Sequence, residues 1–269
     1  GKAWKDNTQE EALLGVSLTG IMDHPVLSGS TNYTQQWFDE GDWSLPQVLT
    51  QLKEIAIETN KEFSEKLGIN QSTAITCVKP SGTVSQLVDS ASGIHTRYSE
   101  YYIRTVRADK KDPLAKMMVD QGFPYEDDVM KPESTYVFSF PMKAPEGAVF
   151  RNDRTAIQQL DHWLVYQRHW CEHKPSVTVY YKDDEVMAVG EWIWKHFDEI
   201  SGISFLPHSD HTYQQAPYQE IDEEQYNVLK NNMPKDVDWT LVGKYESTDM
   251  TSGSQTLACT GSTCEIVDL

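Results

Sequence analysis

The pattern at residues 76–87, a short apolar strand that breaks into a turn and a helix, is the sharpest chemical signal in the sequence. The break falls at Pro80, Ser81, Gly82 and Thr83, where proline and glycine favour a tight turn. Ser81 or Thr83 can cap the helix that follows, and the first turn of a helix offers free N–H groups and a partial positive charge to a phosphate. The pattern is not a Walker loop, which needs a longer glycine spacing and a lysine before the Ser/Thr. An ordinary strand-to-helix connection is the alternative.

Two cysteines near the end of the sequence, Cys259 and Cys264, bracket a small loop that contains glycine. They can close an intramolecular disulfide with modest strain, and on a polar chain end they can also reach a partner. A zinc site would need two further ligands, and the sequence has no second close pair of cysteines. The pattern therefore favours a redox-active dithiol over two thiols without a role.

The remaining thiols and histidines carry weaker signals. Cys77 and Cys171 lie in apolar segments, where a buried structural thiol is the usual state. His169 and His173 are spaced like a helical metal pair, but no third ligand is evident nearby. The same argument applies to the histidines of residues 208–211. No metal site is predicted.

The composition indicates a globular protein and excludes several classes. The chain has 269 residues, a hydrophobic fraction of 39%, and a net charge of −18 from 23 Lys and Arg against 41 Asp and Glu. Phosphate neutralisation in nucleic-acid binding needs clustered basic residues, so nucleic acid is not an expected partner. No apolar run approaches the roughly 18 residues of a membrane span, and no signal peptide is visible. We expect a cytoplasmic protein with no membrane partner.

The elements that must position these residues alternate between strands and helices. This order predicts an α/β fold with mostly parallel pairing. After residue 246 the composition changes to small and polar residues, which predicts a flexible tail. Residues 12–21 are predicted to form a buried strand or a short apolar segment. Further strands are predicted at residues 74–78, 97–106, 136–140, 177–181 and 203–206, and helices at residues 46–67, 114–118, 153–171, 186–197 and 221–229.

Several sequence blocks closely resemble the adenosylcobalamin-dependent, or class II, ribonucleotide reductases of the monomeric, triphosphate-reducing kind. The blocks follow one another in the right order, from about residue 12 to the end. They are the strand and turn at residues 76–87, Ser-Gly-Ile-His at 92–95, Trp-Cys-Glu-His-Lys-Pro-Ser-Val-Thr-Val at 170–179, Phe-Leu-Pro at 205–207, Ser-Asp-His-Thr-Tyr at 209–213, Gln-Ala-Pro-Tyr at 215–218, and the pair Cys259 and Cys264.

The resemblance implies a ten-stranded α/β barrel, of which residues 1–246 form the C-terminal part and residues 247–269 a flexible dithiol tail. In that family a cysteine inside the barrel becomes a thiyl radical when the cobalt–carbon bond of adenosylcobalamin breaks, and two further cysteines reduce the ribose 2′ position. Residues 80–83 would hold the substrate phosphates through backbone N–H groups. Cys259 and Cys264 would reduce the spent active-site disulfide, and a thioredoxin-type donor would recharge them.

The chain lacks any block like the family's radical-cysteine loop, and Cys77 and Cys171 lie in blocks where the family does not place that cysteine. We therefore expect a portion of an adenosylcobalamin-dependent ribonucleoside-triphosphate reductase that is inactive without the N-terminal part of the same enzyme. Its substrate would be a ribonucleoside triphosphate. A non-catalytic nucleotide-binding or dithiol-carrier subunit is the alternative.

Overall fold

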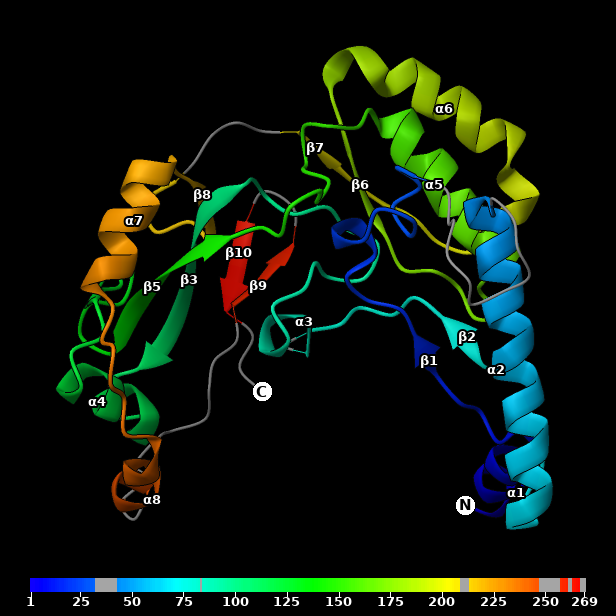
Figure 1. The fold of residues 1–269 in the computed structure, drawn as a ribbon, viewed down its shortest axis with the longest axis horizontal. Coiled ribbons are helices and arrows are strands. Elements are labelled where there is room, and N and C mark those ends of the chain that lie inside the picture. The colour runs from blue at the N-terminus through cyan, green and yellow to red at the C-terminus, as the bar shows by residue number, and fades with distance from the viewer. Residues whose placement is uncertain (32–42, 83, 209–212, 247–256, 261–262, 267–269) are drawn as a thin grey trace. The chain divides into compact units, whose positions relative to one another are not determined.

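The computed structural model describes residues 1–31, 43–82, 84–208, 213–246, 257–260 and 263–266 (Figure 1). The chain divides into two compact units. Unit 1 comprises Gly1–Arg97 and Pro145–His208, and unit 2 comprises Tyr98–Ala144 and Ser209–Leu269. Among the residues described, none of the helices is long and apolar enough to cross a membrane.

Unit 1 is built on short parallel strands. β1 (Val16–Ser17) pairs in parallel with β2 (Thr76–Cys77), and β6 (Thr178–Tyr181) pairs in parallel with β7 (Ser204–Pro207). The helical elements of the unit are α1 (Lys2–Glu11), η1 (Ile21–Asp23), α2 (Leu45–Leu67), α3 (Val84–Leu87), α5 (Ala156–His169), η2 (Asp183–Glu185), α6 (Val186–Lys195) and η3 (Phe197–Glu199).

An isolated parallel bridge between Val78 and Pro175 joins the end of β2 to the segment that leads into β6. The core of unit 1 packs against this segment through α5, whose Trp163 and Tyr166 are fully buried. The Trp163 indole donates to the Pro175 carbonyl at 2.9 Å, and the Tyr166 hydroxyl donates to the carbonyl of Leu27 at 2.9 Å. Both polar groups are therefore satisfied inside an apolar core, as burial of an aromatic polar group requires.

The predicted long helix forms as α2. Ser44 and Gln47 make a capping box at its start, and Gly68 ends it at φ 66°, in the left-handed region. Val48, Leu52, Ile55 and Phe63 fall on one face of the helix at helical spacing. That face is covered only near its start, because Ile55 and Phe63 are 48% and 52% exposed.

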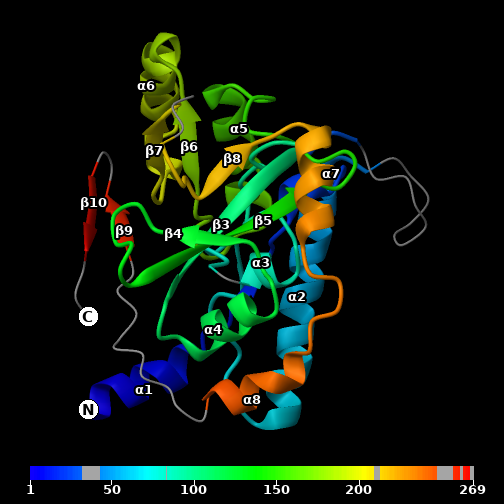
Figure 2. The same ribbon diagram turned by 90° about the vertical axis from the view of Figure 1, so that its left-hand side faces the viewer.

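Unit 2 carries a four-stranded antiparallel sheet in the order β4-β5-β3-β8, seen from the side in Figure 2. β3 (Tyr101–Asp109) pairs along its whole length with β5 (Thr135–Lys143). β4 (Tyr125–Asp127) pairs with the other side of β5, and β8 (Tyr218–Glu220) pairs with the other side of β3. The prediction of mostly parallel pairing is therefore wrong for this unit. The order of strands and helices along the chain does not fix strand direction when a strand returns beside its predecessor.

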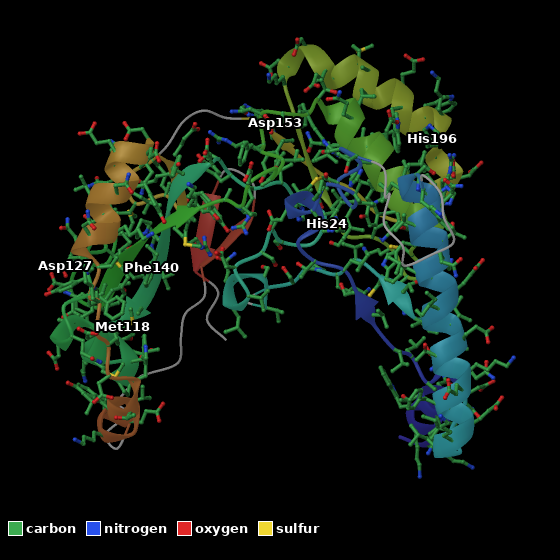
Figure 3. All side chains as sticks on the ribbon, viewed as in Figure 1. His24, Met118, Asp127, Phe140, Asp153 and His196 are labelled. Atoms are coloured by element: carbon green, nitrogen blue, oxygen red, sulfur yellow. The ribbon has the colours of Figure 1, made fainter. Side chains whose placement is uncertain are left out.

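A second apolar cluster forms the core of unit 2. Ala115 and Met118 on α4 (Pro113–Asp120) pack with Phe123 and Phe138, and Phe140 adds to this cluster. Met118 and Phe140 are labelled in Figure 3. The strand predicted at residues 136–140, where Tyr136, Phe138 and Phe140 alternate with other residues, is confirmed as part of β5. The unit also contains α7 (Glu223–Asn232), η4 (Trp239–Leu241), α8 (Val242–Tyr245) and the pair β9 (Leu257–Thr260) and β10 (Thr263–Ile266).

The N-terminal and C-terminal strand predictions have different outcomes. The buried strand expected at residues 12–21 is reduced to the two residues of β1, and both are exposed. The predicted boundary after residue 246 falls where residues 247–256 lie outside the described part of the chain, so the division into a barrel part and a tail stays a prediction.

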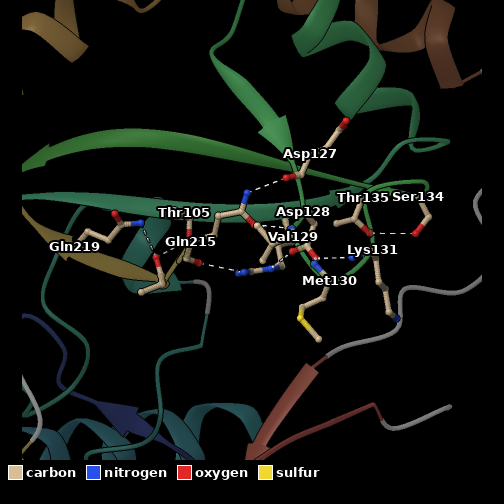
Figure 4. A network of polar contacts seen from close by, with 12 residues as sticks. Thr105, Asp127, Asp128, Val129, Met130, Lys131, Ser134, Thr135, Gln215 and Gln219 are labelled. Carbon is tan, nitrogen blue, oxygen red and sulfur yellow. Dashed lines mark hydrogen bonds and ion pairs between the residues drawn. The ribbon is translucent and has the colours of Figure 1, made fainter. Parts of the chain in front are cut away.

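A polar network fixes the segment before β8 to the sheet (Figure 4). The Arg107 guanidinium donates to Asp128 Oδ2 at 2.6 Å and to the Gln215 carbonyl at 3.0 Å. Asp128 Oδ1 accepts from the amides of Met130 and Lys131, both at 2.9 Å. Gln215 is buried with φ 58°, a left-handed conformation that this network holds in place.

This network predicts an acid-sensitive contribution to stability. Burial acts to raise the pKa of Asp128, but hydrogen bonds from Arg107, Met130 and Lys131 outweigh it and lower the pKa. A carboxyl with a lowered folded-state pKa stabilises the fold above its unfolded pKa, about 3.9, and loses that contribution as the pH falls through the folded value. Asp128→Asn should therefore be less stable than wild type at pH 7, and urea unfolding should show the gap closing below about pH 4.

Arg107→Met should lower the free energy of unfolding by about 3 kcal/mol, because it leaves a buried carboxylate without its charged partner. Arg168→Met is the matched control, since Arg168 makes a bidentate pair with Glu199 on an exposed surface and should cost less than about 1 kcal/mol. Equal losses in the two variants would contradict the role assigned to the network.

Candidate functional site

The predicted phosphate turn lies between β2 and α3 in unit 1. Pro80 and Gly82 are exposed and Ser81 is half-buried. Gly82 has φ 55°, and a Cβ placed there would meet no atom within 4 Å, so the space beside the turn is open. Its N–H has no hydrogen-bond partner within the described part of the chain. Thr83, the fourth predicted residue, lies outside the described residues.

The hydroxyl of Ser81 is engaged inside the protein. It donates to Ser85 Oγ at 2.8 Å, and it lies 2.7 Å from Ser92 Oγ. Because its single hydrogen is given to Ser85, Ser92 is the donor in the second contact. The Ser81 carbonyl accepts from the Val84 amide at 3.0 Å, which closes the turn. Backbone N–H groups are therefore the donors that this turn can offer to an anion.

His95, in the second resembling block, holds two segments together. Its Nδ1 lies 2.9 Å from the Ser92 carbonyl, and its Nε2 lies 3.0 Å from the Thr178 amide nitrogen. An amide can only donate, so Nε2 accepts and Nδ1 carries the hydrogen. Burial lowers the pKa of His95, against the opposing effect of the Ser92 carbonyl, which favours this neutral form. The ring is a structural connector between the turn region and the start of β6.

The spacing of His169 and His173 does not produce a metal site. α5 ends at His169, whose Nδ1 lies 3.3 Å from Thr50 Oγ1. His173 Nε2 lies 3.0 Å from the Leu14 carbonyl and 2.9 Å from that of Ala74. In the described portion of the chain, no group of three or more His, Cys, Asp or Glu side chains is arranged to bind a metal.

Cys77 and Cys171 are both buried free thiols, as predicted. Burial and the neighbouring Cys77 raise the pKa of Cys171 to about 12. A thiol with such a pKa is almost entirely protonated at neutral pH, and the thiolate is the reactive form. Neither residue resembles a reactive cysteine.

The backbone of the predicted dithiol tail forms an antiparallel pair of strands, β9 and β10. The register places Cys264 directly opposite Cys259. The side chains of both residues lie outside the described part of the structure, so the assignment of the pair as a redox dithiol stays a prediction.

Three charged residues beside the turn were missed from the sequence. Arg97 is 5% exposed and forms ion pairs with Asp23 at 2.8 Å and with Asp89 at 3.1 Å. Asp23 lies 74 residues from its partner, and no local pattern links positions so far apart. The one hint in the sequence that a charged cluster lies here is Arg97 itself, a basic residue two positions after the block at 92–95 in an acidic chain.

Comparison with a solved structure identifies the fold class. A solved structure described as a B12-dependent (class II) ribonucleotide reductase matches 90% of this chain with a TM-score of 0.73 and 23% sequence identity. The chain covers 36% of that protein. The expected α/β fold, part of the reductase barrel, is therefore confirmed.

The sequence relatives then specify the kind of reductase. An adenosylcobalamin-dependent ribonucleoside-triphosphate reductase of Lactobacillus gasseri is 28% identical over 84% of the chain, and one of Euglena gracilis is 27% identical over 87%. A probable enzyme of the same name from Dictyostelium discoideum is 34% identical over 66% of the chain. These alignments confirm the resemblance to adenosylcobalamin-dependent ribonucleoside-triphosphate reductases. No family model matches the chain.

The chain spans between a quarter and a third of the length of these curated relatives, 24% to 32% of each. The similarity therefore covers part of a reductase and not the whole enzyme.

The burial of two thiols gives a direct prediction about cysteine reactivity. In the folded chain at pH 8, Cys77 and Cys171 should react with a thiol reagent only after urea unfolds the protein. Peptide mapping after a short pulse of iodoacetamide identifies which residues are alkylated. Rapid labelling of Cys171 in the native chain would contradict its assignment as a buried structural thiol.

Proposed function

We propose that the chain is the C-terminal portion of an adenosylcobalamin-dependent ribonucleoside-triphosphate reductase, an oxidoreductase that forms 2′-deoxyribonucleoside triphosphates. The observation that carries the proposal is the turn at residues 80–82, open and exposed at the end of a buried strand, in a chain similar to these enzymes over about 85% of its length. Its thiols and its soluble substrate fit a reducing, cytoplasmic setting.

The turn would hold the substrate phosphates through individual N–H groups. α3 has only four residues, so its macrodipole adds little, and the net charge of −18 opposes an anion. Hydrogen bonds to a charged acceptor contribute about 1.5–3 kcal/mol each, enough for two or three of them to position a triphosphate. The exposed Lys79 beside the turn supplies a local positive charge.

Cys259 and Cys264 would act as a shuttle. One thiolate attacks the active-site disulfide formed in turnover, a mixed disulfide forms, and the second thiolate displaces the active-site thiol. The active-site pair gains two electrons and two protons, and the tail pair becomes a disulfide. A thioredoxin-type dithiol then reduces the tail by the same exchange. The N-terminal part of the same reductase would supply the radical cysteine and the substrate-reducing pair.

Adenosylcobalamin would supply the radical that initiates the reaction. Among the described residues, one hollow of about 550 Å³ is lined by α2 alone. An apolar groove of about 250 Å³ is lined by Tyr181, Val186, Val189, Gly190, Ile193 and Phe205. Neither is assigned to the cofactor. The chain's proposed roles are therefore phosphate binding and thiol exchange, and neither passes through the cofactor.

Gly82→Val tests the phosphate assignment. A β-branched residue at φ 55° strains the turn by about 1–2 kcal/mol and fills the open space where a phosphate would bind. With the N-terminal part present, we expect the affinity for a ribonucleoside triphosphate to fall at least tenfold. Gly68→Val is the matched control, because Gly68 has φ 66° and equally open surroundings at the end of α2. Isothermal titration calorimetry that finds equal affinity in both variants would refute the assignment.

Cys259→Ser and Cys264→Ser test the shuttle in the reassembled enzyme. Each variant should lose turnover driven by thioredoxin but keep turnover driven by dithiothreitol, which can reach the active site directly. Ala258→Ser is the control, since it changes the same strand without removing a thiol. If either cysteine variant keeps full thioredoxin-driven turnover, the tail pair is not the electron carrier.

A further inference from the structure

Arg97 lies at the centre of a buried polar cluster next to the proposed phosphate turn. Its Nε donates to Asp23 Oδ1 at 2.9 Å and its Nη2 donates to Asp23 Oδ2 at 2.8 Å, so the guanidinium and carboxylate meet as a two-pronged fork. The Arg97 side chain is 4% exposed and that of Asp23 13%. The pair therefore has a fixed geometry that a solvated surface pair would lack.

The same pair fixes the segment that follows α3. Arg97 Nη1 donates to Asp89 Oδ1 at 3.1 Å, and Nη2 donates to the Asp89 carbonyl at 2.7 Å. Asp23 Oδ2 in turn accepts from the Ala91 amide at 2.7 Å. Asp89 has φ 48°, an unfavourable conformation for a residue with a side chain, and these contacts hold it.

The segment from β1 completes the support around Ser92. The Ala91 carbonyl accepts from the Gly20 amide at 2.7 Å and from Thr19 Oγ1 at 3.1 Å. The Gly93 amide donates to Thr19 Oγ1 at 2.9 Å. Both neighbours of Ser92 are thus anchored to one segment, which leaves the Ser92 hydroxyl in a fixed place, 2.7 Å from Ser81 Oγ.

We infer that Ser92, held by the Arg97–Asp23 pair, is a positioning residue for the phosphate turn. The inference rests on the proposed function for the role of that turn. Ser92 donates to Ser81, whose own hydrogen is thereby directed to Ser85 and away from the exposed side of the turn. The turn then presents backbone N–H groups in one arrangement. Preorganised donors bind an anion without the cost of ordering them first.

A buried ion pair is a costly way to stabilise a loop, since an apolar set of similar volume often does as well. What it adds is a defined geometry, because a fork of charged hydrogen bonds tolerates little displacement. A turn that binds phosphate needs its N–H donors held in a defined arrangement. A purely structural role for Arg97 would affect unfolding without affecting the turn in the folded chain.

Amide hydrogen exchange of the full chain without ligand tests the positioning directly. In Ser92→Ala and in Arg97→Lys, which keeps the charge but loses the fork, we expect exchange of the Val84 and Ser85 amides to become about tenfold faster. Arg168→Lys is the matched control, because it breaks a bidentate pair of similar geometry with Glu199 elsewhere in unit 1. Unchanged exchange at residues 84–85 in Ser92→Ala overturns the inference, whatever the binding data show.

Calorimetric binding of inorganic triphosphate to the same full-length variants tests the consequence. Ser92→Ala should weaken binding threefold to tenfold at an unchanged melting temperature, and Ser81→Ala combined with Ser92→Ala should weaken it no further than the stronger single variant. Faster exchange with unchanged affinity overturns the positioning role. A wild-type chain that binds no triphosphate even with the N-terminal part present refutes the proposed function of the turn, while the exchange result still decides the coupling between Ser92 and the turn.

Discussion

The hydrogen bonding of β2 on both of its sides is the constraint on which the rest of unit 1 depends. Thr76, Cys77 and Val78 are fully buried, so each backbone polar group needs a partner inside the protein. On one side of the strand, the Cys77 carbonyl accepts from both the Leu18 amide and the Trp170 indole. On the opposite side, the Thr76 carbonyl accepts from two successive amides, at residues 172 and 173. The strand therefore directs its end, the turn at residue 80, to one fixed position.

The sequence predicted elements well where a local rule sufficed. The helix predicted at residues 46–67 forms as α2, which ends at Gly68 in the left-handed region. Strand β5 followed from strict alternation. Strand direction did not follow, because the antiparallel return of β5 beside β3 depends on which surfaces can be buried together and not on the order of elements.

The candidate site was likewise only partly predictable from the sequence. The turn was readable because proline and glycine restrict the backbone locally, and family blocks strengthened it. The ion pair of Asp23 and Arg97 that supports the turn could not be predicted, because the two residues lie 74 positions apart and meet only in the folded chain. The same is true of the Arg107, Asp128 and Gln215 contacts in unit 2, where one member comes from each of three separate segments. Buried polar networks are properties of the tertiary fold, and a single sequence carries no periodic signal of them.

His95 stays neutral across the neutral pH range, so its hydrogen bonds to the turn region and to β6 do not change there. Protonation would put a hydrogen on Nε2 where the Thr178 amide already donates, so the charged ring would lose its link to β6. Because burial lowers its pKa, the ring stays neutral in the folded chain while an unfolded chain would already bind the proton near pH 6.5. Acidification below that value therefore favours the unfolded chain, which binds a proton that the ring does not accept while it holds the Thr178 amide.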